Sequence, residues 1–290
     1  MDATTGILFA LAAMVSWGFG DFLTQRTTRV VGSAKTLFFT GLVGFVALSP
    51  FVLPALSDIT INTFLLLSAL SLVVMIATAF DFEALRTGKI AVVEPIVGLE
   101  MPMAIGVSLA IVGEAISSQF ILIISLVIVG TILTVFKGLH HAKSINVLEK
   151  GVLLAIIAAV GTALTTVLVG ISSKETSPLV AIWFSHGALM IVGGIAVQMK
   201  SGLHTIFGDI KRHPLTIGFQ TTADNAAWLL FAFATTLLPI SIAAAISGGY
   251  VAMAVALGLF INKEKIKGHQ YIGIVMVSVG IVLLSYLFEG

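Results

Sequence analysis

The sequence predicts an all-α membrane protein whose ten transmembrane helices form two five-helix repeats of inverted topology. Three observations lead to this fold class. Hydrophobic residues make up 58% of the 290 and charged residues only 10%, whereas soluble domains are about 45–50% apolar and about 25% charged. Apolar runs long enough to cross a bilayer recur along the chain, and the second half repeats features of the first.

The elements follow from the lengths of the apolar runs. A helix needs about 20 mostly apolar residues to cross about 30 Å of hydrocarbon. Pro239 and the length of the apolar run around it separate the eighth span from the ninth. No Lys or Arg precedes the first run, so it is interpreted as a span and not as a signal peptide. The predicted spans are residues 5–25, 34–53, 63–85, 90–112, 119–136, 151–171, 178–198, 214–237, 241–261 and 269–288.

Basic residues predict the orientation. Of the 15 Lys and Arg residues, 14 follow odd-numbered spans, and Lys174 is the exception. Because short loops rich in Lys and Arg stay cytoplasmic, both termini are expected to be extracytoplasmic. We expect a multi-pass protein of the inner (plasma) membrane.

The two halves of the chain resemble each other. An offset of 150 residues aligns spans three to five with spans eight to ten, and an offset of 145 extends the match weakly through the remaining spans. Since each repeat has an odd number of spans, the copies must enter the membrane in opposite directions, as in many secondary transporters. An old duplication kept only for stability is the alternative. The predicted repeats are residues 1–145 and 146–290, and the aligned pairs include Gly98 with Gly248, Glu114 with Glu264, and Gly130 with Gly280.

Several short motifs resemble a known family. Trp17-Gly18, Glu94-Pro95, Gly113-Glu114, Glu264, Gly130 and Gly280 are similar to the EamA-type repeat of the drug/metabolite transporter (DMT) superfamily. The resemblance covers nearly the whole chain as two units. It implies a ten-helix transporter of small metabolites, often an exporter of amino acids or related compounds, with a central cavity between the halves. The chain departs from the pattern at Ala245, where the second repeat usually has a proline.

Ionisable residues inside spans are candidates for functional sites. One group lies within about two turns of the cytoplasmic ends of spans one, three and four. It is expected to form an ion-pair layer, either static or acting as a gate that closes the cavity. Within it, an acid and a base spaced i, i+3 attract each other weakly. The group consists of Asp21, Asp81, Glu83, Arg86 and Glu94.

A second group reaches the middle of the membrane. Glu100 lies about 16 Å along a helix from Lys89, and its repeat mate is Tyr250. The pseudo-twofold therefore predicts an acid and a phenol on opposite sides of the same cavity. Midplane tryptophans are interpreted as lining a pocket, with packing against a neighbouring helix as the alternative. The candidate substrate-binding residues are Glu100, Tyr250, Asp224, Asn225, His186, Trp17, Trp183 and Trp228.

Two prolines predict the shape of span four. Pro95 and Pro102 cannot donate hydrogen bonds to the preceding turn, so the span is expected to be kinked and to line a hydrated cavity. Glu94 and Glu100 are about 240° apart on a continuous helix and are expected not to share one site. Because a partly dry setting favours the neutral form of a carboxyl group, Glu100 is a candidate proton carrier. A structural, permanently protonated Glu100 is the alternative.

The sequence predicts a secondary active transporter that exports or exchanges a small organic metabolite by alternating access, with protons as a candidate coupling ion. It contains zero cysteines and no GxSxG, HExxH or GxxxxGK motif, so no enzymatic activity, cofactor or metal site is expected. The thinly spread basic residues predict no nucleic-acid partner. The oligomeric state is open, and a monomer is compatible with the sequence. The alternatives are a lipid-modifying membrane enzyme that uses His186 and Asp224, or a non-transporting membrane subunit.

Overall fold

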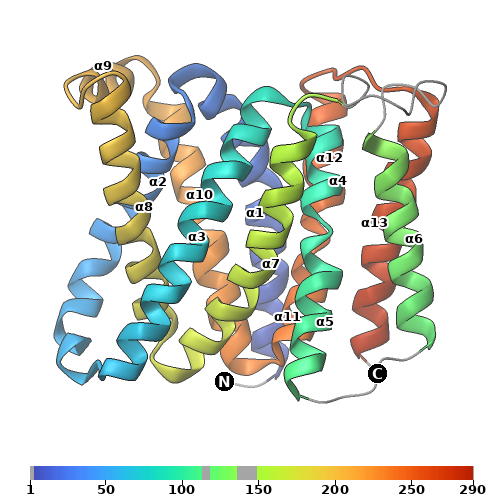
Figure 1. The fold of residues 1–290 in the computed structure, drawn as a ribbon, viewed down its shortest axis with the longest axis horizontal. Helices are drawn as coiled ribbons and strands as arrows, with labels where there is room; N and C mark the ends of the chain where they lie inside the picture. The colour runs from blue at the N-terminus through green and yellow to red at the C-terminus, as the bar shows by residue number, and fades with distance from the viewer. Residues whose placement is uncertain (1–2, 113–117, 136–148, 290) are drawn as a thin grey trace.

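The computed structural model describes residues 3–112, 118–135 and 149–289, and the regular elements in these ranges are helices (Figure 1). The motif Gly113-Glu114 lies outside the described residues. In chain order the elements are α1 Ala3–Val31, α2 Ser33–Val52, η1 Leu53–Asp58, α3 Ile61–Thr87, α4 Ile90–Val97, α5 Glu100–Val112, α6 Ser118–Val135, α7 Val152–Glu175, α8 Pro178–Lys200, α9 Thr205–Arg212, α10 Pro214–Leu237, α11 Ile240–Ser247, α12 Tyr250–Phe260 and α13 Gly268–Glu289.

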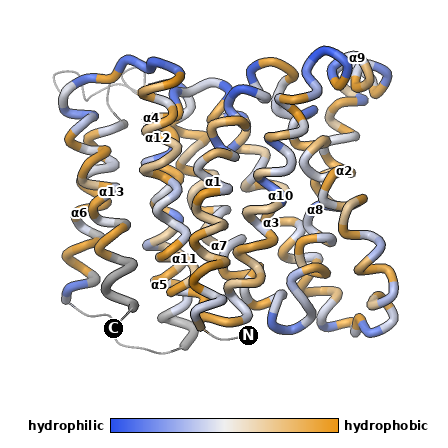
Figure 2. The backbone as a smooth tube through the Cα atoms, turned by 180° about the vertical axis from the view of Figure 1, so that it is seen from behind, coloured by the Kyte–Doolittle hydropathy of each residue, from blue (hydrophilic) through white to orange (hydrophobic). Residues whose placement is uncertain are grey.

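Several described segments are long and apolar enough to cross a membrane. They support a multi-pass membrane protein, and Figure 2 shows the hydrophilic parts of the chain gathered at the two ends of the bundle. The predicted spans at α6, α10 and α13 are not among these segments. In α10, Gln220, Asp224 and Asn225 lower the hydropathy. The segments are Ala3–Val31, Ser33–Asp58, Ile61–Thr87, Ile90–Ser108, Val152–Glu175, Pro178–Lys200 and Ile240–Phe260.

The fourth and ninth predicted spans are each broken into two helices. In the fourth, α4 ends at Val97 and α5 begins at Glu100. The Leu99 amide donates to the Ile96 carbonyl at 3.1 Å, a tighter turn than an α-helix makes. The ninth span breaks between α11 and α12 although it has no proline at the matching positions. Proline alone therefore does not explain the breaks.

The two breaks lie against each other through glycines. A Cβ atom placed on Gly98 would lie 2.9 Å from Cγ2 of Val251, and one placed on Gly248 would lie 2.8 Å from Cγ of Met101. Gly98 and Met101 align with Gly248 and Val251 at the offset of 150 residues, so the two contacts are equivalent. Larger side chains would separate the backbones, so glycine is needed at both positions for this close approach. Because α4 contacts α12 and α5 contacts α11, the two broken segments run antiparallel.

The closest helix pairs join the two halves of the chain. The helix α1 packs on α10, and α3 packs on α7. In the sequence alignment α1 corresponds to α7 and α3 to α10, so the two pairings are equivalent. The pairs α2 with α8 and α6 with α13 each join matching helices. The halves thus pack against each other along their length, and α1 begins at the end of the bundle where α13 ends (Figure 1).

Candidate functional site

A small cavity lies where α1, α3, α4, α5, α7, α10 and α12 meet, beside the helix breaks. We call it the acid cavity. Its free volume is about 40 Å³, which is room for about three water molecules. A metabolite larger than a few atoms requires the surrounding helices to separate. The lining residues are Trp17, Asp21, Thr78, Asp81, Phe82, Glu94, Val97, Glu100, Thr162, Asp224, Trp228 and Tyr250.

The repeat mates Glu100 and Tyr250 meet in this cavity. The Tyr250 hydroxyl donates a hydrogen bond to Oε1 of Glu100 at 3.1 Å, and both side chains are buried. Each residue begins the helix that follows a break, and the two breaks pack against each other. Beside them Trp17 lies edge-on to Trp228, with ring centroids 5.0 Å apart, and 5.8 Å from the Tyr250 ring. These contacts form an aromatic wall.

Three acids expected in an ion-pair layer line the acid cavity instead. Asp21, Asp81 and Glu94 take part in no ion pair among the described residues. Their expected partners turn away, since Arg26 donates to Oδ1 of Asn262 at 3.2 Å and the Lys89 amine lies 3.3 Å from Glu149. Counting residues along a span predicts how far a side chain lies from the end of its helix, but not the direction in which it points.

Glu94 and Glu100 share the acid cavity, so the expectation that they occupy separate sites is wrong. The expected 240° separation assumed a continuous helix. The break at Gly98 and Leu99 changes the rotation between α4 and α5 and brings both carboxyl groups to one side. Glu94 is 1% exposed and Glu100 is 4% exposed.

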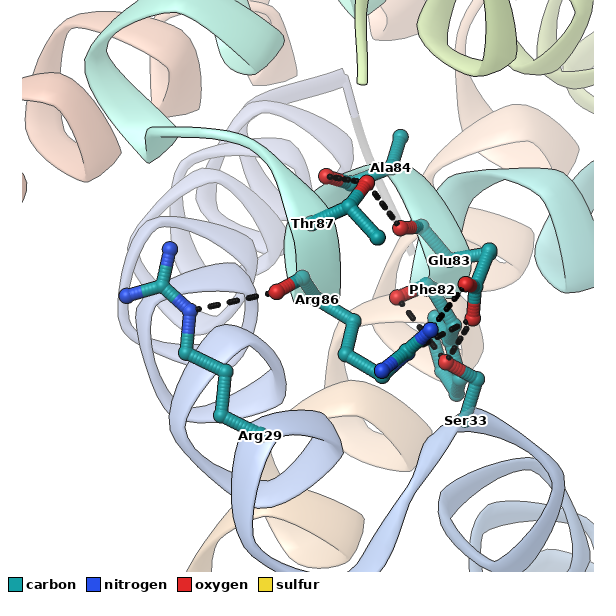
Figure 3. A network of polar contacts seen from close by, with 7 residues as sticks. All are labelled: Arg29, Ser33, Phe82, Glu83, Ala84, Arg86 and Thr87. Atoms are coloured by element: carbon teal, nitrogen blue, oxygen red, sulfur yellow. Dashed lines mark hydrogen bonds and ion pairs between the residues drawn. The ribbon is translucent and has the colours of Figure 1, made fainter. Parts of the chain in front are cut away.

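The Glu83–Arg86 pair forms as expected, but outside the cavity. Figure 3 shows the two side chains bonded within α3, with the Ser33 hydroxyl donating to Oε2 of Glu83 at 2.7 Å. In the same network the Arg29 side chain donates to the Arg86 carbonyl at 3.4 Å. Both members of the pair are at least one-third exposed, so the pair contributes little stability. It ties the end of α3 to α1 and to the start of α2.

His186 lies next to the acid cavity and not in it. It lines a second void of about 10 Å³ together with Asp224 and Trp228, which belong to both cavities. The His186 Nδ1–H donates to the Ile182 carbonyl at 2.8 Å, and the buried Nε2 has no hydrogen-bond partner. His186 is therefore a neighbour of the site.

Two other candidate residues pack between helices away from the acid cavity. Nδ2 of Asn225 donates to the carbonyl of Thr40 at 3.1 Å and so joins α10 to α2. The Trp183 ring stacks on Phe45 at 4.6 Å, and its Nε1–H donates to the Ser49 hydroxyl at 2.9 Å. Both residues hold the bundle together in this arrangement.

Four lining residues are not among the candidates from the sequence, which were ionisable side chains, Asn225, the tryptophans, Tyr250 and the prolines. Two are threonines, and the Thr162 hydroxyl donates to its own helix at the Ala158 carbonyl, 2.8 Å away. Threonine is common in apolar helices, so no sequence signal distinguishes these positions. The four are Thr78, Phe82, Val97 and Thr162.

A polar cluster joins α1 and the loop after α12 to the start of α4. Glu264 accepts hydrogen bonds from the backbone amides of Ile90 and Ala91 at 3.1 and 2.9 Å, which caps α4 with a carboxylate. Gln25 donates to Glu264 at 3.3 Å, and Asn262 donates to Gln25 at 2.7 Å. We call Gln25, Asn262 and Glu264 the basic-end latch, because the basic ends of α1, α3 and α8 lie on this side.

The described residues contain no group of three or more acidic or histidine side chains placed to hold a metal ion. The chemistry of the site is that of carboxyl groups, hydroxyl groups and aromatic rings.

Comparisons with known proteins agree with this architecture. A model of the EamA-like transporter family matches residues 4–136 and 149–286. The search of curated proteins gives no match. Among solved structures, a crystal structure of a protein aligns over 99% of this chain and 99% of its own, with 14% identity and a TM-score of 0.60. That likeness shows the fold alone.

Proposed function

The chain belongs to the EamA-like transporter family, and on this premise we propose that it is a secondary active transporter of a small organic metabolite that works by alternating access. Its substrate crosses through the acid cavity. The bundle comprises ten spans in two inverted repeats, residues 1–145 and 146–290, with α4–α5 and α11–α12 each forming one broken span. The basic end faces the cytoplasm of the inner (plasma) membrane, and the transporter exports or exchanges its substrate.

The observation that carries the proposal is the hydrogen bond between Glu100 and Tyr250. It joins equivalent positions of the two repeats at the centre of the bundle. Irregular backbone inside a membrane is tolerated where it is buried in protein or lines a cavity, and transporter sites are often built from broken helices of this kind. The two residues therefore stand at a substrate site between the halves.

Two features support alternating access, the small volume of the acid cavity and the hydrogen bonds of the basic-end latch. The acid cavity holds about 40 Å³, too little for a metabolite of even ten non-hydrogen atoms. The basic-end latch joins α1 and the loop after α12 to the start of α4. We propose that this arrangement is closed toward the basic end and that the latch separates when the cavity opens there.

Proton coupling uses the carboxyl groups of the acid cavity. Acids inside a membrane mark proton and ion pathways because only protein, water or ligand can solvate them. Glu100 and Asp224 lie in one cavity, so a proton on either can be exchanged for substrate. We propose that both act in coupling.

Flux measurements in proteoliposomes test the proposal. Purified protein is expected to carry at least one member of a panel of radiolabelled amines, amino acids, sugars and nucleosides at a rate that depends on the transmembrane pH difference. Glu100→Gln is expected to lower the flux and its pH dependence, whereas Glu83→Gln, outside the cavity, is expected to leave both unchanged. Absence of flux across the panel together with turnover of lipid would contradict transport and favour an enzyme.

A further inference from the structure

We propose that the acid cavity binds the ammonium group of an organic cation, so that the transported substrate is a small amine and not an anion or a zwitterionic amino acid. Transport of the amine rests on the proposed function, whereas its binding to the acid cavity can be tested alone. The inference rests on the composition of the lining, on unpartnered buried oxygens and on the aromatic wall.

The carboxyl groups of the acid cavity have no basic side chain beside them in the lining. Its twelve lining residues include five carboxylic acids and no Lys, Arg or His. The nearest basic side chains along the chain are occupied at the basic end, where Arg26 bonds Asn262, and Lys89 bonds Glu149 and the Lys265 carbonyl. A bound cation would supply the charge that the lining lacks.

Buried carboxyl oxygens of the lining also lack hydrogen-bond donors. Oε2 of Glu94, Oε2 of Glu100 and Oδ1 of Asp81 are buried and have no hydrogen-bond partner. Glu94 and Glu100 are 1% and 4% exposed, so both groups lie well inside the protein. Buried polar atoms are normally paired, and an exception calls for an explanation. An ammonium group carries several N–H donors and no acceptor, which matches a site made of acceptors.

The lining offers no basic side chain to the carboxylate group of an amino acid. The Tyr250 hydroxyl already donates to Glu100, and the Thr162 hydroxyl donates to Ala158. The lining contains no basic side chain that could pair with a carboxylate. An anionic or zwitterionic substrate would therefore place a carboxylate among five carboxyl groups with no basic partner.

The aromatic wall favours an organic cation. Trp17, Trp228 and Tyr250 present ring faces and edges within one small space. Cations are attracted to the faces of such rings, most strongly to Trp. Phe82 and Val97 add apolar surface for the carbon chain next to the ammonium group. The free volume of about 40 Å³ accepts the head group, and the rest of the molecule needs the open arrangement.

A metal cation fits the lining less well. Within residues 3–112, 118–135 and 149–289, no cluster of acidic or histidine side chains has the arrangement of a metal site. The five acids are spread around a cavity walled by indole and phenol rings, whereas hard cations require a close shell of oxygen ligands.

Binding of a matched four-carbon series tests the inference. The probes are 1,4-diaminobutane, 4-aminobutyrate and succinate. Along this series a terminal aminomethyl group is replaced by a carboxylate, first at one end and then at both. The Kd of each is measured with purified protein by isothermal titration, together with the shift in Tm that each causes. We expect 1,4-diaminobutane to bind most tightly and succinate not to bind.

Two isosteric substitutions locate the binding site. Glu94→Gln and Glu100→Gln are each expected to weaken binding of 1,4-diaminobutane by about tenfold or more, since each removes a charge-assisted hydrogen bond. Glu83→Gln, outside the cavity, is the matched control and is expected to change the Kd less than about twofold.

The inference is overturned if 4-aminobutyrate or succinate binds as tightly as the diamine, if none of the three binds, or if the diamine binds both cavity variants as tightly as the unaltered protein. Flux of the labelled probes in proteoliposomes separates this failure from failure of the proposed function. Flux of succinate or 4-aminobutyrate without diamine flux would contradict the cation site and leave transport intact. Diamine binding without flux of any substrate would contradict transport and leave the cation site intact.

Discussion

The substitution Glu264→Ala probes how the basic end stays closed. The carboxylate of Glu264 accepts from two backbone amides of α4, those of Ile90 and Ala91, and is held in place by Gln25. Removing it leaves the first turn of α4 without its cap and breaks the link between α4 and the loop after α12. We expect the closed arrangement to lose stability relative to the arrangement open at the basic end.

The magnitude follows from the contacts that are lost. Hydrogen bonds to a charged group contribute about 1.5–3 kcal/mol each, and loss of a helix N-cap costs about 0.5–2 kcal/mol. Glu264 is partly exposed, so water can hydrogen-bond to the freed backbone amides and reduces the free-energy cost. A net change of about 2 kcal/mol corresponds to a shift of about thirtyfold in the ratio of open to closed protein, at about 1.4 kcal/mol per factor of ten.

Thiol labelling measures this shift directly. The chain has zero cysteines, so Val97→Cys, in the lining of the acid cavity, provides a single reactive thiol. A membrane-impermeant maleimide is added from the basic end, and the labelling rate is compared with and without Glu264→Ala. We expect the rate to rise about thirtyfold if the open arrangement is a minor population, and Lys265→Ala, whose side chain is exposed, to leave it unchanged. Equal labelling rates within about twofold would refute the latch.

Three further predictions concern the cavity and the helix breaks. Tyr250→Phe removes the donor to Glu100 and leaves a buried carboxyl oxygen unpaired, so we expect unfolding to become easier by about 1–3 kcal/mol and flux to fall, as measured by thermal unfolding and proteoliposome uptake. Glu100→Gln is expected to flatten the pH profile of flux, because the amide cannot exchange a proton. Glu83→Gln is the control, and an unchanged profile in Glu100→Gln would show that Glu100 has a structural role. Gly98→Val is expected to lower Tm by several degrees or prevent folding because the added atoms overlap the facing broken helix, whereas Gly208→Ala, with no neighbour within 4 Å of the added atom, is expected to be neutral in the same assay.

Internal repetition indicated that two residues of the site belong to one cavity. Glu100 and Tyr250 differ by the repeat offset, which predicted an acid and a phenol on opposite sides of that cavity, and in the structure the Tyr250 hydroxyl donates to Glu100. The offset relates equivalent positions of the two halves, and such positions meet where they lie close to the interface between the halves. Local chemistry gives no such signal, since an isolated acid and an isolated phenol in apolar helices predict no contact.

Helix geometry limited the rest of the prediction. Counting residues along a span gives the depth of a side chain, but the direction of the side chain depends on how neighbouring helices pack. Asp21 and Glu94 therefore turned out to line the acid cavity, while Trp183 and Asn225 pack between other helices. The break in the ninth span was missed because Ala245 replaces the proline of the first repeat, and the close approach of glycines becomes visible only when the halves are assembled.

Crosslinking across the basic end tests the central claim, which is that the two halves move against each other to expose the acid cavity. Arg26 and Asn262 lie in different halves and are joined by a hydrogen bond of 3.2 Å. Both are replaced by cysteine, and flux is measured before treatment with a short reducible thiol crosslinker, after it, and after reduction, with each single-cysteine variant as control. Flux is expected to stop on crosslinking and to return on reduction in the double variant alone. Full flux through the crosslinked protein would contradict movement of the halves.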